Sequence, residues 1–172
     1  MRCSKLSKYP EEITEENPYF CNEELLWNCP NLLEASQAFY MWDGWGTSMK
    51  GQIPPLLFRA CTKLENINGI FAGCGQLTGG LDGQLFSRAG KLKNVGNAFS
   101  GCSGLNGDIS GALFTATNNP LITTFYETFS GCSNLTGTAP TLWTQFSSAD
   151  GSRCFSGCSK LDNYDSIPAQ WK

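Results

Sequence analysis

The sequence predicts a repeat solenoid, a chain wound into similar turns that stack on one another. The first observation is a phrase, Phe-x-Gly-Cys-x-x-Leu, that recurs four times with its phenylalanines 28, 30 and 26 residues apart. A period of this length is typical of solenoids, in which each turn can bury its apolar edge only against its neighbours. The residues that carry this repeat are Phe71, Cys74, Leu77, Phe99, Cys102, Leu105, Phe129, Cys132, Leu135, Phe155, Cys158 and Leu161.

Two further phrases recur in phase with the first one. One ends in a leucine–aromatic pair, as at Phe58 and Phe86, and the other leads back to the next Phe-x-Gly-Cys, as in Leu64-x-x-Ile67-x-x-x-Phe71. The second of these phrases fits a short strand that enters a tight turn, although its three-residue spacing also suits a helical turn. We expect such strands to lie parallel on neighbouring turns, about 4.8 Å apart.

Polar residues occupy the variable positions of these predicted strands. On stacked turns they would form one continuous ribbon that faces solvent, which is the usual layout of a recognition surface. Every solenoid has such a ribbon, whether or not it binds anything. The candidate binding residues on it are Asn66, Asn68, Lys93, Asn94, Thr124 and Tyr126.

Residues 1–48 are predicted to hold irregular N-terminal repeats that cap the solenoid, followed by an aromatic insertion. The insertion replaces the Gly-Cys turn at residues 40–48 and adds Tyr40, Trp42 and Trp45 to the candidate binding residues. Insertions in repeat proteins map to loops on one face, and exposed Tyr and Trp rings stack on sugars or on partner side chains. The alternative is that the two tryptophans fold inward and fill the gap left by the missing Gly-Cys.

Residues 49–172 carry the regular repeats and continue the same single domain. The last unit, 144–172, is degenerate, because the expected apolar strand residues are missing around residues 147–151. This unit is either a C-terminal cap or the start of a contact with a partner, since an open repeat edge must be covered.

Charge and hydropathy exclude two classes of partner. The chain has 12 Lys and Arg residues against 15 Asp and Glu residues, a net charge of −3, and the sequence shows no clustered basic surface. Nucleic acid is therefore not expected as a partner. No apolar stretch reaches the length of a membrane span, and the N-terminus lacks the apolar region of a secretory signal, so we expect a removed N-terminal region or release by another route such as lysis.

The nine cysteines are predicted to be mostly thiols. Four of them share one repeat position and should form a buried column whose parallel side chains suit disulfides poorly: Cys74, Cys102, Cys132 and Cys158. The candidates for a disulfide are Cys21, Cys29, Cys61 and Cys154, with Cys29–Cys61 as the pair to test. A metal site is not expected, because the chain has no Cys-x-x-Cys and no histidine.

No catalytic constellation stands out, and we expect neither an enzyme nor a cofactor. Without histidine the chain has no Ser-His or Cys-His pair. Asp82 and Asp108 occupy near-equivalent positions in adjacent units and would allow a paired-carboxylate glycosidase. Turn aspartates in a repeat are the preferred interpretation.

With the Phe-x-Gly-Cys-x-x-Leu phrase and its period, the chain resembles the BspA-like leucine-rich repeats over residues 49–171 and more weakly over 3–39. The resemblance implies a right-handed, leucine-rich-repeat-like coil with short parallel strands and an irregular convex side. Such repeats occur in bacterial surface proteins, in some host-associated protists and in phage tail or fibre proteins. Here the units are longer than the short surface-protein form.

The resemblance also implies a function and a location. We expect a non-catalytic recognition or adhesion module, displayed on a cell or virion surface, that binds a glycan or protein partner. The alternative is a structural subunit of a larger particle, such as a phage tail fibre or decoration protein, that contacts neighbouring subunits. Either interpretation places the chain outside the cell, at a cell surface or a virion surface.

Overall fold

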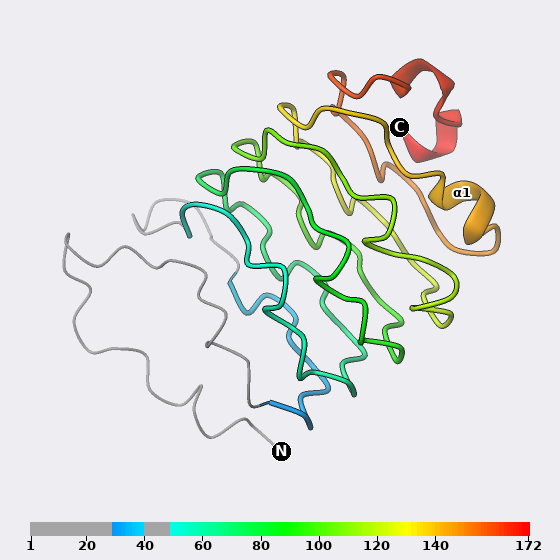
Figure 1. Cartoon of the computed structure of the whole chain (residues 1–172). Helices are drawn as coiled ribbons and strands as arrows, with labels where there is room; N and C mark the ends of the chain where they lie inside the picture. The colour runs from blue at the N-terminus through cyan, green and yellow to red at the C-terminus, as the bar shows by residue number, and fades with distance from the viewer. Residues whose placement is uncertain (1–28, 40–48) are drawn as a thin grey trace.

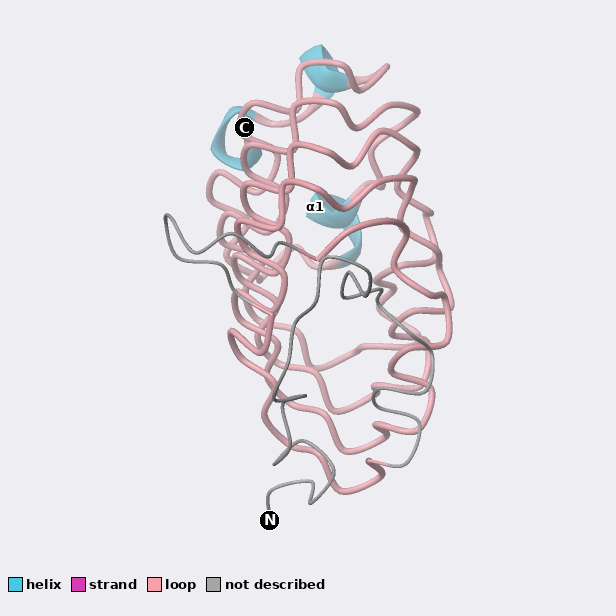
Figure 2. Cartoon of the chain, turned by 90° about the vertical axis from the view of Figure 1, so that its left-hand side faces the viewer, coloured by secondary structure: helices cyan, strands magenta, loops and turns pink. Residues whose placement is uncertain are grey.

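The computed structural model describes residues 29–39 and 49–172, and its turns lie side by side along the molecule (Figure 1). Within these two ranges, regular helix is confined to three short segments near the C-terminal end: α1 (Leu142–Gln145), η2 (Tyr164–Ser166) and η3 (Ala169–Trp171). Figure 2 shows that loops and turns make up nearly all of the remaining described chain. The assignment to the leucine-rich-repeat class stays a prediction.

Neighbouring turns are joined by isolated parallel β-bridges. One row of bridges runs from Glu34 to Asn66, Asn94, Thr124 and Asp150, at steps of 32, 28, 30 and 26 residues. A second row, on another part of each turn, pairs Gly51 with Leu77, Leu81 with Ile109 and Asp108 with Thr136. The described residues contain these bridges but no longer strand, so the predicted strands are reduced to single paired positions.

The backbone hydrogen bonds explain why no longer strand forms. The N–H groups of Ile67, Gly69, Phe71 and Gly73 donate to carbonyls of the next turn, at 2.7–3.0 Å. The N–H groups between them, such as those of Ile70 and Ala72, donate to the carbonyl three residues back on the same turn. The chain therefore alternates between a strand-like and a 3₁₀-like bond, which satisfies the backbone without a continuous ladder.

A left-handed residue on each turn makes this alternation possible. Gly69 has φ 63°, and the equivalent positions on other turns are Asn97 at 55°, Glu127 at 52° and Arg153 at 57°. Non-glycine residues seldom adopt such angles, apart from asparagine and aspartate. The conformation recurs because the hydrogen bonds to both neighbouring turns require it.

The core consists of aligned rows of aromatic side chains. Phe39, Phe71, Phe99, Phe129 and Phe155 stack in one row, with ring centroids 5.2–5.6 Å apart and planes within 16° of parallel. A second row stacks Phe58, Phe86 and Phe114 at 4.9 and 5.4 Å. Phenylalanines at the same repeat position of successive turns therefore stack on one another, an arrangement that aromatic rings favour when they are offset.

The repeat cysteines form a row beside the first aromatic row. Cys74, Cys102, Cys132 and Cys158 are buried thiols, as predicted. Each Sγ donates to the carbonyl of the row phenylalanine on the preceding turn, at 3.0–3.1 Å. Burial raises the pKa of Cys74 to about 11 and that of Cys158 to about 12. A thiolate is therefore disfavoured in this row, and these cysteines are chemically inert while folded.

Cys29 and Cys61, the candidate pair to test, are not joined by a disulfide. Cys29 is disulfide-bonded, but Cys61 carries a buried thiol, whose pKa burial raises to about 11. Side chains at one repeat position of neighbouring turns run parallel, and that arrangement fits disulfide geometry poorly.

The C-terminal residues cover part of the last turn. The N–H groups of Arg153 and Phe155 donate to the carbonyls of Gln170 and Trp171, at 3.2 and 2.8 Å. The Trp171 indole is 2% exposed and lies against Gly151, where a Cβ would come within 2.0 Å of the ring. Residues of the degenerate unit thus act as a further, shortened turn.

Candidate binding surface

The first row of bridges brings the predicted ribbon residues together. We call Asn66, Asn68, Lys93, Asn94, Thr124 and Tyr126 the polar column. The parallel bridges place Asn66 beside Asn94 and Asn94 beside Thr124. Two residues further along each turn, Gly96 separates Asn68 from Tyr126, and a Cβ on Gly96 would lie 3.0 Å from Asn68 Nδ2 and 3.3 Å from the Tyr126 carbonyl.

Half of the polar column stabilises its own turns. The side-chain oxygens of Asn66 and Asn94 accept the backbone N–H two residues on at 2.9 Å, and Thr124 Oγ1 does the same at 3.2 Å. These are the local turns that asparagine and threonine side chains commonly form. These three residues are half-buried and already hydrogen-bonded. Their main role is therefore to stabilise the backbone of the surface, and they have little capacity left to bind a ligand.

Of the other three residues, Lys93 and Tyr126 face solvent and Asn68 is half-buried. Tyr126 is 39% exposed, and the Lys93 side chain is 54% exposed. Lys93 Nζ lies 2.7 Å from Glu65 Oε2 on the preceding turn, and Arg153 pairs with Glu127 in the same way at 2.9 Å. Exposed ion pairs of this kind contribute little to stability, so these side chains remain available for contacts with a partner.

The first row of bridges continues onto the unit that the sequence predicts to be degenerate. Asp150 pairs with Thr124, and its carboxylate accepts the Ser152 N–H at 3.0 Å. Hydrogen bonds from Ser152 lower the pKa of this exposed carboxyl group. This turn lacks the apolar residues of the other turns, and for that reason its sequence suggests a degenerate unit. The signal that could have identified it is Asp150, a polar capping residue at the position of Asn66, Asn94 and Thr124.

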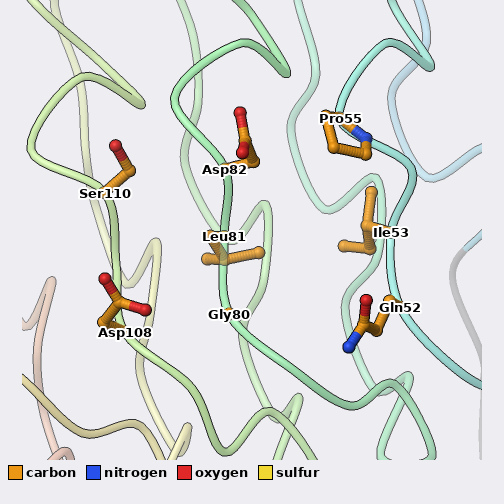
Figure 3. A pocket seen from close by; sticks show the side chains of 8 residues that line it. All are labelled: Gln52, Ile53, Pro55, Gly80, Leu81, Asp82, Asp108 and Ser110. Atoms are coloured by element: carbon orange, nitrogen blue, oxygen red, sulfur yellow. The ribbon is translucent and has the colours of Figure 1, made fainter.

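A shallow groove lies over the second row of bridges (Figure 3), with a volume of about 370 Å³. Its lining residues come from three successive turns: Gln52, Ile53, Pro55, Gly80, Leu81, Asp82, Asp108 and Ser110. Both carboxylates of the considered glycosidase pair line this groove. Asp82 Oδ1 accepts the Gln84 N–H at 2.7 Å, which is a turn-capping contact.

Other predicted features lie beyond these surfaces. Tyr40, Trp42 and Trp45 fall outside the described residues. Within residues 29–39 and 49–172, no three His, Cys, Asp or Glu side chains are grouped so that they could hold a metal ion. In the same ranges, every helix is too short or too polar to cross a membrane.

Comparisons with protein-family models, with curated proteins and with solved structures find no match for this chain.

Proposed function

We propose that the chain is a repeat solenoid of the BspA-like, leucine-rich-repeat type that acts as a non-catalytic recognition module. It binds a glycan or protein partner through the polar column while displayed on a cell or virion surface. The observation that carries the proposal is the parallel register of Asn66, Asn94 and Thr124, which aligns polar side chains of successive turns on one face.

The way these side chains are held supports the proposal. The capping bonds of Asn66, Asn94 and Thr124 fix the backbone beneath Asn68, Gly96 and Tyr126. A surface fixed in advance loses little conformational entropy when a ligand binds, which favours affinity. Tyrosine adds a large ring at low entropic cost.

The C-terminal end supports a recognition module over a structural subunit. A subunit that docks end to end needs a terminal turn with open hydrogen-bonding groups. Here the carbonyls of Gln170 and Trp171 already accept the N–H groups of Arg153 and Phe155, so a neighbour would have to displace them there, while the N–H groups of Gly151 and Gly157 on the same turn have no acceptor among the described residues. Sedimentation velocity at several concentrations separates the two functions, because a recognition module stays monomeric and an end-docking subunit assembles.

The experiment that tests the proposal measures binding of the purified chain to a glycan array and, by flow cytometry, to cell suspensions. The double variant N68A/Y126A removes the exposed Tyr126 ring and the half-buried Asn68 side chain of the column and leaves the caps in place. We expect it to lose about tenfold or more in affinity, as contact residues at an interface centre do.

The matched control is Q52A/Q84A, which removes two exposed side chains on the face of the second bridge row. This control should bind as the unaltered chain does. Equal binding by N68A/Y126A and the unaltered chain would refute the polar column as the contact surface.

A further inference from the structure

Cationic side chains gather on two neighbouring turns of this acidic chain. Arg59 and Lys63 lie on one turn, and Arg88, Lys91 and Lys93 lie on the next. All five are exposed, and we call them the basic patch. The two turns are in direct contact, since the rings of Phe58 and Phe86 stack at 4.9 Å and the Lys93 N–H donates to the Glu65 carbonyl at 2.8 Å.

The patch is short of negative charge. Within residues 57–65 and 85–93 the only acidic residue is Glu65, which pairs with Lys93. Five cations against one carboxylate give a local charge of +4, whereas the whole chain carries −3. A local excess of this kind attracts anionic groups and steers their approach.

Lys91 is the residue that departs from the pattern. Three other lysines of the described turns reach an acceptor on the preceding turn: Lys63 Nζ donates to Asn31 at 2.9 Å, Lys93 Nζ to Glu65 at 2.7 Å and Lys160 Nζ to Asn134 at 2.6 Å. At the repeat position of Lys91, the preceding turn carries Lys63, a like charge. Like charges at one repeat position disfavour close approach of the two side chains, and an anion placed between them would offset that repulsion.

Exposed leucines border the patch on both sides. Leu121 occupies the repeat position of Lys63 and Lys91 on the turn after Lys91, and it is 42% exposed. Leu33 occupies the repeat position of Glu65 and Lys93 on the turn before Glu65, and it is 50% exposed. Among the described residues, these are two of the three large hydrophobic side chains exposed to solvent.

We propose that the basic patch, together with Leu33 and Leu121, binds an acidic segment of a partner protein that carries apolar side chains among its carboxylates. This inference rests on the proposed function and names the chemistry of the partner. The leucines favour a protein segment over a polysaccharide, because a sugar acid offers carboxylates or sulfates without apolar side chains. Nucleic acid is disfavoured, because the patch ends after two turns and the next turn, residues 113–123, has no cation.

The test uses the full chain and a fluorescently labelled peptide in which glutamates are interspersed with leucines and serines. Two control peptides replace the glutamates by glutamine or the leucines by serine. Heparin and oligo-dT test the other polyanion classes. Affinity is measured by fluorescence anisotropy between about 50 and 300 mM salt, a range over which screening changes strongly.

The test variant is K63Q/K91Q, and the matched control is R153Q/K160Q, which removes the same charge two turns away. Both pairs are exposed, and circular dichroism checks that both variants stay folded. We expect the acidic peptide to bind more weakly as salt rises and to lose about tenfold in affinity with K63Q/K91Q only. Both control peptides should bind more weakly than the acidic one.

Three results would overturn the inference. Equal losses in both variants would show a response to net charge alone. Binding of heparin or oligo-dT without binding of the peptide would assign the patch to another partner class. Absence of peptide binding at the lowest salt would remove the patch as a docking surface, and the N68A/Y126A experiment would then still decide the proposed function by itself.

Discussion

Replacing Phe99 with leucine tests how much the aromatic row stabilises the stack. The Phe99 ring is fully buried and stacks on Phe71 and Phe129, at 5.6 Å in both directions and with planes 16° and 2° apart. Each aromatic pair contributes about 0.5–1.5 kcal/mol beyond its buried area. Leucine keeps most of the burial but loses both pairs, so we expect a loss of about 1–3 kcal/mol. Alanine would also leave a cavity and should cost about 3–5 kcal/mol.

Urea unfolding in the presence of a reductant measures this loss, with fluorescence and circular dichroism compared as a test of two-state behaviour. The matched control is Phe146→Leu, a buried ring with one tilted partner, Phe125, at 4.9 Å. This control should lose about half as much, because a single pair is removed. A Phe99→Leu protein within about 0.5 kcal/mol of the unaltered chain would refute the stacking argument.

Three other predictions use the same unfolding assay. Asn97→Ala should destabilise by about 1 kcal/mol, because φ is 55° there, whereas Asn97→Gly should stay within about 0.5 kcal/mol; equal effects would contradict this reasoning. Asn119→Ala should cost about 2–3 kcal/mol, since the buried amide donates to the carbonyls of Phe86 and Ala89, and a smaller loss would mean that water replaces it. In the unfolded chain the thiols lose their protons near pH 9.0, whereas burial raises the pKa of Cys74 to about 11 in the folded chain. Between these pH values unfolding releases protons, so the free energy of unfolding should fall as pH rises above 9.0. A pH-independent free energy between 9.0 and about 11 would contradict the burial of these thiols.

The repeated apolar positions could be predicted from the sequence, because stacking requires the same side chain on each turn. Phe71, Phe99, Phe129 and Phe155 recur for this reason, and the structure places their rings in one row. The thiol row follows from the same logic, since a small side chain must recur where space is small.

The backbone of the predicted strands could not be foreseen in the same way. Apolar spacing does not distinguish a strand from a 3₁₀ turn, and the chain uses both in alternation. The decisive information is the positive φ at Glu127 and Arg153, two residue types that rarely adopt it. Hydrogen bonds between turns enforce this conformation, and no local preference of these residues reveals it.

The repeat positions of the candidate surface follow from the sequence, but the way its side chains are held does not. Asn66, Asn94 and Thr124, three of the candidate binding residues, also cap their own turns. The basic patch could not be recognised in the sequence, because Lys63 and Lys91 are 28 residues apart and only stacking brings their turns together. In a repeat protein a charge cluster forms from residues of neighbouring turns, and these residues are far apart in the sequence.

Residue-resolved amide hydrogen exchange tests the central claim, that hydrogen bonds between turns hold the chain in this register. The amides of Gly73, Gly101 and Gly131 donate to the next turn at 2.7, 2.7 and 2.8 Å, although all three residues are exposed. Gly157 occupies the same repeat position with the same left-handed backbone, but its amide has no acceptor among the described residues. We predict slow exchange at the first three glycines and fast exchange at Gly157. Equally fast exchange at all four would contradict the stacked arrangement.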